Sequence, residues 1–66
     1  MKIPNRKPKV KLVGNDDNAF AIIARVKQAL RKAGADKEYI DQFVKESMEG
    51  DYNNLLATAM KYADVY

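Results

Sequence analysis

The chain has 66 residues, enough for one small domain, and its 47% hydrophobic and 32% charged residues are typical of a globular protein rather than a disordered chain. It contains neither Cys nor His, which excludes disulfide bonds, zinc sites built from those residues, and catalysis by a thiolate or an imidazole. The net charge of +3 is unevenly spread: residues 1–13 carry five cations and no carboxylate, whereas residues 34–66 carry seven carboxylates and three cations.

The N-terminal segment combines positive charge with proline. Pro4 and Pro8 fix φ and lack a backbone N–H, so residues 1–9 are predicted to form a basic, flexible arm before a single domain over residues 10–66. The arm lacks the apolar block of a signal peptide, and no apolar run is long enough to span a membrane, so we expect a cytoplasmic protein with no membrane partner. Residues 9–13 (KVKLV) alternate as a short strand that could pair with the C-terminal DVY.

A helical pattern begins at Ala19. Apolar residues recur at spacings of three and four as far as Ala33, and Gly34 then provides a natural end. Three residues just before this helix have side-chain oxygens that suit an N-cap: Asp16, Asp17 and Asn18. The alternative for the two carboxylates is a magnesium site shared with a bound phosphate, which the sequence favours less than capping.

Two further helices follow. Asp36 is predicted to cap a helix that ends near Glu49, and Asp51, after Gly50, is predicted to cap a third. The residues expected in the core include Phe20, Ile40, Phe43, Val44, Met48, Tyr52, Leu55, Leu56, Ala59, Met60 and Ala63. Turns this short require the helices to pack at an angle or antiparallel. The predicted fold class is therefore all-α, a compact three-helix domain with a basic, flexible arm, which a short N- and C-terminal strand pairing could complete.

The cations suggest one function. A basic arm beside a helix with outward-facing cations is a plausible footprint for the phosphates of nucleic acid. The candidate residues are Lys2, Arg6, Lys7, Lys9, Lys11, Arg25, Lys27, Arg31 and Lys32. The second helix is acidic and the third has no arginine, so such binding would be sequence-tolerant rather than a reading of the major groove. The simpler interpretation, that these charges only keep the surface solvated, is the one the sequence favours.

The third helix and the tail suggest another function. A small, polar outward face could accept a second helix closely, and a tail with tyrosine could dock on its own domain or add to a partner's sheet. The candidate interface residues are Asn54, Ala57, Thr58, Tyr62 and Tyr66. A homodimer is one form that such an interface could take.

No residue pattern indicates catalysis, a cofactor or a metal centre. Ser47 and Thr58 have no histidine to activate them, and the three glycines are spaced as helix punctuation rather than as a phosphate-binding loop. We therefore expect a protein that is not an enzyme and that has no catalytic residues and no cofactor.

Three segments in Gly14–Val65 carry a resemblance: GNDDNAF, RVKQAL and GDYNNLL. In this order they resemble a group of short, uncharacterised bacterial and phage-associated proteins. The resemblance implies a bacterial or phage origin and assigns no site residues. Together with the residue patterns, it leads to the expectation of a small, non-enzymatic helical domain that binds another protein, with sequence-tolerant binding of nucleic acid as the alternative.

Overall fold

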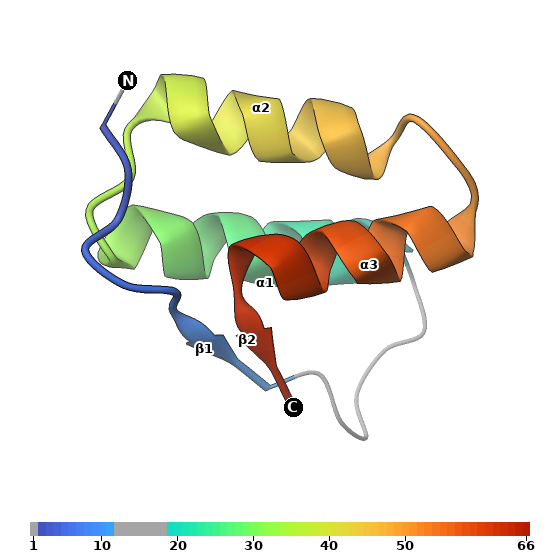
Figure 1. The fold of residues 1–66 in the computed structure, drawn as a ribbon, viewed down its shortest axis with the longest axis horizontal. Coiled ribbons are helices and arrows are strands. Elements are labelled where there is room, and N and C mark those ends of the chain that lie inside the picture. Colours follow the sequence, from blue (N-terminus) through green and yellow to red (C-terminus); the bar gives the residue numbers. More distant parts are fainter. Residues whose placement is uncertain (1, 12–18) are drawn as a thin grey trace.

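The computed structural model describes residues 2–11 and 19–66, where three helices pack beside a minimal sheet (Figure 1). The helices are α1 (Ala19–Lys32), α2 (Lys37–Ser47) and α3 (Tyr52–Tyr62). The sheet consists of β1 (Lys9–Val10) and β2 (Asp64–Val65), which run parallel. The predicted three-helix domain and its terminal strand pairing are confirmed. The predicted cap at residues 16–18 and the last two positions of the predicted strand lie outside the described ranges.

Short polar signals set the helix ends. Gly34 follows α1 with a φ of +99°, a left-handed conformation that glycine adopts without strain. The Asp36 side chain accepts a hydrogen bond from the backbone N–H of Tyr39 (2.9 Å) at the start of α2, and Asp51 accepts one from Asn54 (3.0 Å) at the start of α3. Both predicted caps are confirmed, and each is worth about 1 kcal/mol of stability.

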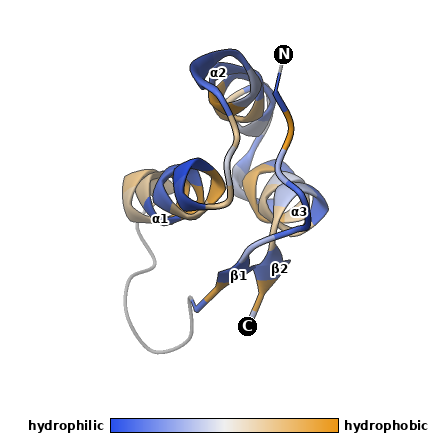
Figure 2. Ribbon diagram, turned by 90° about the vertical axis from the view of Figure 1, so that its left-hand side faces the viewer, coloured by the Kyte–Doolittle hydropathy of each residue, from blue (hydrophilic) through white to orange (hydrophobic). Residues whose placement is uncertain are grey.

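The core lies where the three helices meet. Val26 and Leu30 of α1 and Phe43 of α2 are fully buried, and Figure 2 shows the helices at the corners of a triangle with hydrophobic sides turned inward. The ring of Tyr62 meets those of Phe43 and Tyr39 edge-on, each at 5.3 Å between centroids. These aromatic contacts join α3 to α2. Within the described residues, no helix has the length and apolar character needed to cross a membrane.

The side of α3 that faces the core differs in part from the predicted one: Leu55, Ala59 and Ala63 are buried as predicted. Thr58 and Tyr62 are buried with Leu55 and Ala59, whereas Met60 is exposed. The predicted and observed sets both recur at spacings of three and four, so periodicity does not separate them. The observed set buries the large Tyr62 ring against α2, and an unbranched methionine side chain stays in solvent.

Three other residues predicted for the core lie on the surface: Phe20, Met48 and Tyr52. Each lies at or next to the end of a helix, and its side chain is exposed there. Ser47 is buried beside them, and its hydroxyl donates to the carbonyl oxygen of Val44 at 2.9 Å. This hydrogen bond satisfies the buried hydroxyl of Ser47. Met48, the next residue along the chain, is exposed to solvent.

A polar cluster closes the edge of the α2–α3 contact. The Tyr62 hydroxyl donates to the Glu46 carboxylate, which also accepts from Lys61 Nζ at 3.2 Å. Gln42 Nε2 donates to the Tyr62 oxygen at 3.2 Å. Burial raises the pKa of Tyr62 to about 12, and the bond to Glu46 acts in the same direction. The bond from Tyr62, followed by those from Lys61 and Gln42, lowers the pKa of Glu46 from its ordinary value.

The raised pKa of Tyr62 predicts a loss of stability in alkali. Above pH 10 the unfolded chain releases the phenol proton while the folded chain holds it up to about pH 12, so the free energy of unfolding falls across that window. The expected fall is roughly 1–3 kcal/mol, since one pH unit corresponds to about 1.4 kcal/mol per proton. Urea unfolding of the wild type and of Tyr62→Phe at pH 8, 10 and 11.5 measures this fall. The lysines titrate in both proteins, so the difference between the two profiles reports on Tyr62. Parallel pH profiles for the two proteins would contradict the assignment.

The arm runs along the domain from the start of α2 to β1 (Figure 1). Lys2 and Asp36 exchange two hydrogen bonds: the Lys2 N–H donates to Asp36 Oδ2 at 2.7 Å, and the Asp36 N–H donates to the Lys2 carbonyl at 3.0 Å. The N–H groups of Tyr39 and Lys2 lower the pKa of the Asp36 carboxyl. At the other end the Asp64 N–H donates to the Pro8 carbonyl at 2.8 Å. The segment expected to be a flexible arm is thus hydrogen-bonded to the helical domain at both ends.

Candidate functional site

The exposed side of α1 carries only positive charge. The helix contains four cations and no carboxylate, because its apolar residues occupy the inward stripe and its polar positions are Lys, Arg and Gln. Arg25 and Lys32 are seven residues apart, two turns along one strip of the surface, and Lys27 and Arg31 share the neighbouring strip. The two strips face different surroundings.

The arm places further cations beside the strip that holds Arg25 and Lys32. A hollow of about 500 Å³ lies between arm and helix, with Arg6 and Lys9 on one side and Lys32 on the other. A second hollow of about 240 Å³ adds Lys11 and Arg25, and the two share Lys9 and Lys32. The hollows therefore form one continuous depression. We call it the cationic groove and define it by five residues: Arg6, Lys9, Lys11, Arg25 and Lys32.

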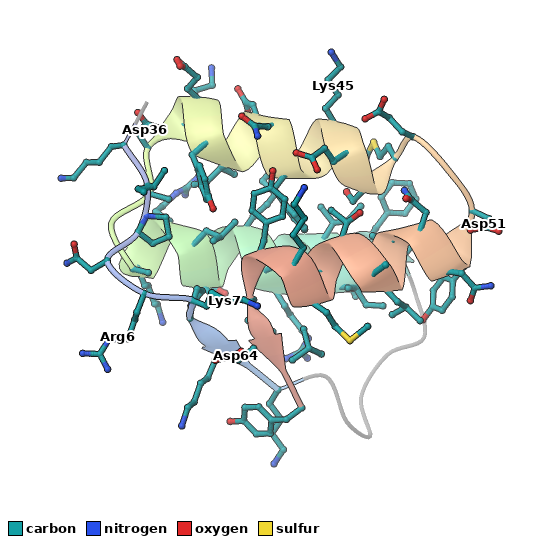
Figure 3. All side chains as sticks on the ribbon, in the orientation of Figure 1. Arg6, Lys7, Asp36, Lys45, Asp51 and Asp64 are labelled. Carbon is teal, nitrogen blue, oxygen red and sulfur yellow. The ribbon has the colours of Figure 1, made fainter. Side chains whose placement is uncertain are left out.

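The floor of the cationic groove is small and uncharged. Besides the cations, the lining consists of Ala29 of α1, Ala33, Pro8 and Val10, and the amide side chains of Asn5 and Gln28. No lining residue is acidic, and the five cations form no ion pair with any residue of ranges 2–11 and 19–66. Among the described lining residues, the groove thus gathers positive charge around a shallow trough. Figure 3 shows Arg6 pointing away from the helices into solvent.

The other predicted cations lie elsewhere. Lys7 turns to the opposite side of the arm, where Nζ donates to the Met60 carbonyl at 2.8 Å and lies 4.0 Å from the Asp64 carboxylate (Figure 3). Lys2 is beside Asp36, and Lys27 and Arg31 line a separate hollow on the next strip of α1. Five of the nine predicted residues therefore meet in the groove, two flank it, and two do not reach it.

The predicted protein-interface residues do not form one surface. Thr58 is 7% exposed and Tyr62 is 4% exposed, so the prediction that they face a partner is wrong: both belong to the core. Asn54 is half-buried, and its Nδ2 donates to the Glu46 carbonyl at 3.0 Å. Ala57 and Tyr66 are exposed but belong to different elements. The reason is the orientation of α3, which buries Thr58 and Tyr62 and leaves Ala57 in solvent.

An exposed apolar surface that the sequence did not predict lies at the other end of the helices. Phe20, Met48 and Tyr52 are exposed by 73%, 56% and 44%, and they surround a hollow of about 320 Å³ over Ile23 and Leu55. We call this set of three residues the apolar end. It was missed because apolar residues at helical spacing were assigned to the core.

Among the described residues, no three carboxylates are grouped closely enough to hold a metal ion. Comparison of the chain with protein-family models, with curated proteins and with solved structures found no match.

Proposed function

We propose that this domain binds nucleic acid without strong sequence preference, by holding the phosphodiester backbone in the cationic groove. The observation that carries the proposal is the gathering of five cations from two separate segments, the arm and α1, around one trough, with no ion pair to any of them within residues 2–11 and 19–66. Solubilising charges need no such convergence, because they act equally well when scattered.

The position of the acidic residues supports the same function. The carboxylates of α2 and its flanks, such as Asp41 and Glu49, do not line the trough, and none of its described lining residues is acidic. A polyanion would therefore be attracted to one side and repelled from another, which orients the encounter. Phosphate contacts of this kind carry little sequence information.

The test is the salt dependence of oligonucleotide binding. Five groove cations, each releasing about 0.7 counterion from a single strand, give an expected slope of about −3 to −4 for the logarithm of the association constant against the logarithm of salt concentration. Fluorescence anisotropy with labelled mixed-sequence oligonucleotides measures this slope between about 50 and 300 mM NaCl, a range over which the Debye length falls from about 14 to about 6 Å. A slope near −1 would contradict binding in the groove.

A second candidate is protein binding, and the apolar end favours it. Three large apolar side chains around one hollow are unusual for the surface of so small a domain, and such surfaces often mark protein contacts. A homodimer formed through this end is the simplest version.

Met48→Lys tests the homodimer. If the apolar end self-associates, the wild type should show a mass that rises with concentration in sedimentation velocity, and Met48→Lys should remain a monomer because a charge cannot be buried there without a partner. Met60→Lys, at an equally exposed methionine on α3, is the matched control and should behave as the wild type. A wild-type mass that stays monomeric at every concentration would exclude self-association.

A further inference from the structure

Tyr66 stands at one end of the cationic groove. Its backbone N–H donates to the Val10 carbonyl at 3.0 Å, which extends the pairing of the two strands by one residue. Side chains alternate along a strand, so Val10 and Val65 turn toward the helices while Lys9, Asp64 and Tyr66 turn outward. The Tyr66 ring is 57% exposed although its backbone is held in place.

The surface around Tyr66 is continuous with the groove. A hollow of about 440 Å³ is lined by Lys9, Asp64, Val65 and Tyr66, and Lys9 also lines both hollows of the groove. The acidic side chain among these lining residues, Asp64, lies 4.0 Å from Lys7 Nζ. A strand that leaves the groove past Lys9 would meet the aromatic ring next.

We propose that the ligand of the groove is single-stranded nucleic acid and that the Tyr66 ring stacks on one of its bases. The inference rests on the proposed function and adds the ligand class and the residue that selects it. A cationic trough followed by an exposed, anchored aromatic ring is the arrangement that sequence-tolerant binders of single strands use, because every unpaired base has a face on which a ring can stack. In a duplex the base faces are covered by their neighbours.

The walls of the groove also disfavour a duplex. A helix that reads the major groove needs both flanks clear, but the exposed strip of α1 has the arm and β1 alongside it. The cations of arm and helix border a common trough, with Arg6 at its outer edge. A single phosphodiester backbone can enter such a trough and receive cations from both sides, and its bases remain free to turn toward Tyr66.

The other tyrosines do not offer the same contact. Tyr62 is buried, Tyr39 is half-buried against it, and Tyr52 belongs to the apolar end, at the opposite end of α3 from β2. Tyr66 is thus the aromatic residue of the described part of the chain that shares a hollow with a groove cation.

The experiment measures dissociation constants by anisotropy for four labelled 12-mers: single-stranded DNA, single-stranded RNA, the DNA duplex, and a DNA strand whose central residues are abasic. Tyr66→Ala is expected to weaken binding of the intact single strands by about tenfold, in line with the measured worth of one stacked base. It should leave the abasic strand within twofold of the wild type, and Tyr66→Phe should keep wild-type affinity because the ring remains. The ratio of RNA to DNA affinity identifies which single strand is preferred, and either preference agrees with the proposal.

A spectroscopic readout accompanies the affinities. The chain contains no tryptophan, so Tyr66→Trp introduces a single indole whose fluorescence should be quenched by the single strands and not by the abasic strand. Equal affinity of the wild type and Tyr66→Ala for the intact single strands, or equal binding of duplex and single strand by the wild type, would overturn the inference. In that case binding that still depends on Arg25 and Lys32 would leave the proposed function standing, whereas absence of binding to all four ligands would overturn both.

Discussion

Replacing Phe43 with alanine is expected to lower the free energy of unfolding by about 3–5 kcal/mol, the usual cost of truncating a buried phenylalanine. The ring is fully buried at the meeting point of the helices, and its loss would leave a cavity beside Leu30 and Val26. It would also remove the edge-on contact with Tyr62, at 5.3 Å between ring centroids, that helps to hold α3 on α2. Since the core of a domain below about 70 residues rarely supplies more than about 3–5 kcal/mol of net stability, a large part of the population would unfold at 37 °C.

Urea denaturation followed by circular dichroism at 222 nm measures this loss. The matched control is Met60→Ala, which also truncates a large apolar side chain of the domain but at a position 56% exposed, and it should change stability by less than about 0.5 kcal/mol. If Phe43→Ala were as mild as its control, the centre of the core would not lie between the three helices as described.

Neutralising three groove cations together is expected to weaken oligonucleotide binding about fifty-fold at roughly 0.15 M salt, since each lost phosphate contact removes about 0.7 released counterion. The variant is Lys9→Gln/Arg25→Gln/Lys32→Gln. The same relation predicts that the salt slope becomes shallower by about 2. None of the three side chains has an ion pair within the described residues, so stability should change little.

The control for this variant changes net charge by the same amount on the other side of the molecule. Lys37→Gln/Lys45→Gln/Lys61→Gln removes three cations of α2 and α3 that lie away from the groove. If binding depends on the groove, this protein should keep most of its affinity and its slope. Equal weakening of both triple variants would mean that net charge alone attracts the ligand, and the groove would have no special part in binding.

Those parts of the fold that depend on neighbouring residues could be predicted from the sequence. Asp36 and Asp51 each cap a helix because an oxygen three residues before an orphan N–H is a local arrangement, and Gly34 ends α1 because a left-handed residue is needed there. Which side of α3 is buried does not depend on neighbouring residues alone. Met60 and Tyr62 fit the helical period equally well, and the contact with α2 decides between them.

The candidate site, too, has a part that the sequence predicts and a part that it does not. The cations of α1 were evident from composition, and helical spacing already separates Arg25 and Lys32 from Lys27 and Arg31. The groove itself depends on where the arm lies, which is set by the pairing of Lys9 with Asp64 fifty-five residues later and by the bonds between Lys2 and Asp36. Contacts so distant along the chain leave no pattern that a sequence window can reveal.

The strand pairing also orders the events of biosynthesis. β2 follows all three helices, so a ribosome must polymerise the chain as far as Val65 before β1 has a partner. The helices can collapse earlier through contacts of shorter range, whereas closing so long a loop is entropically costly and comes late. We therefore expect nascent chains that lack the last strand to be helical while β1 still has no partner strand.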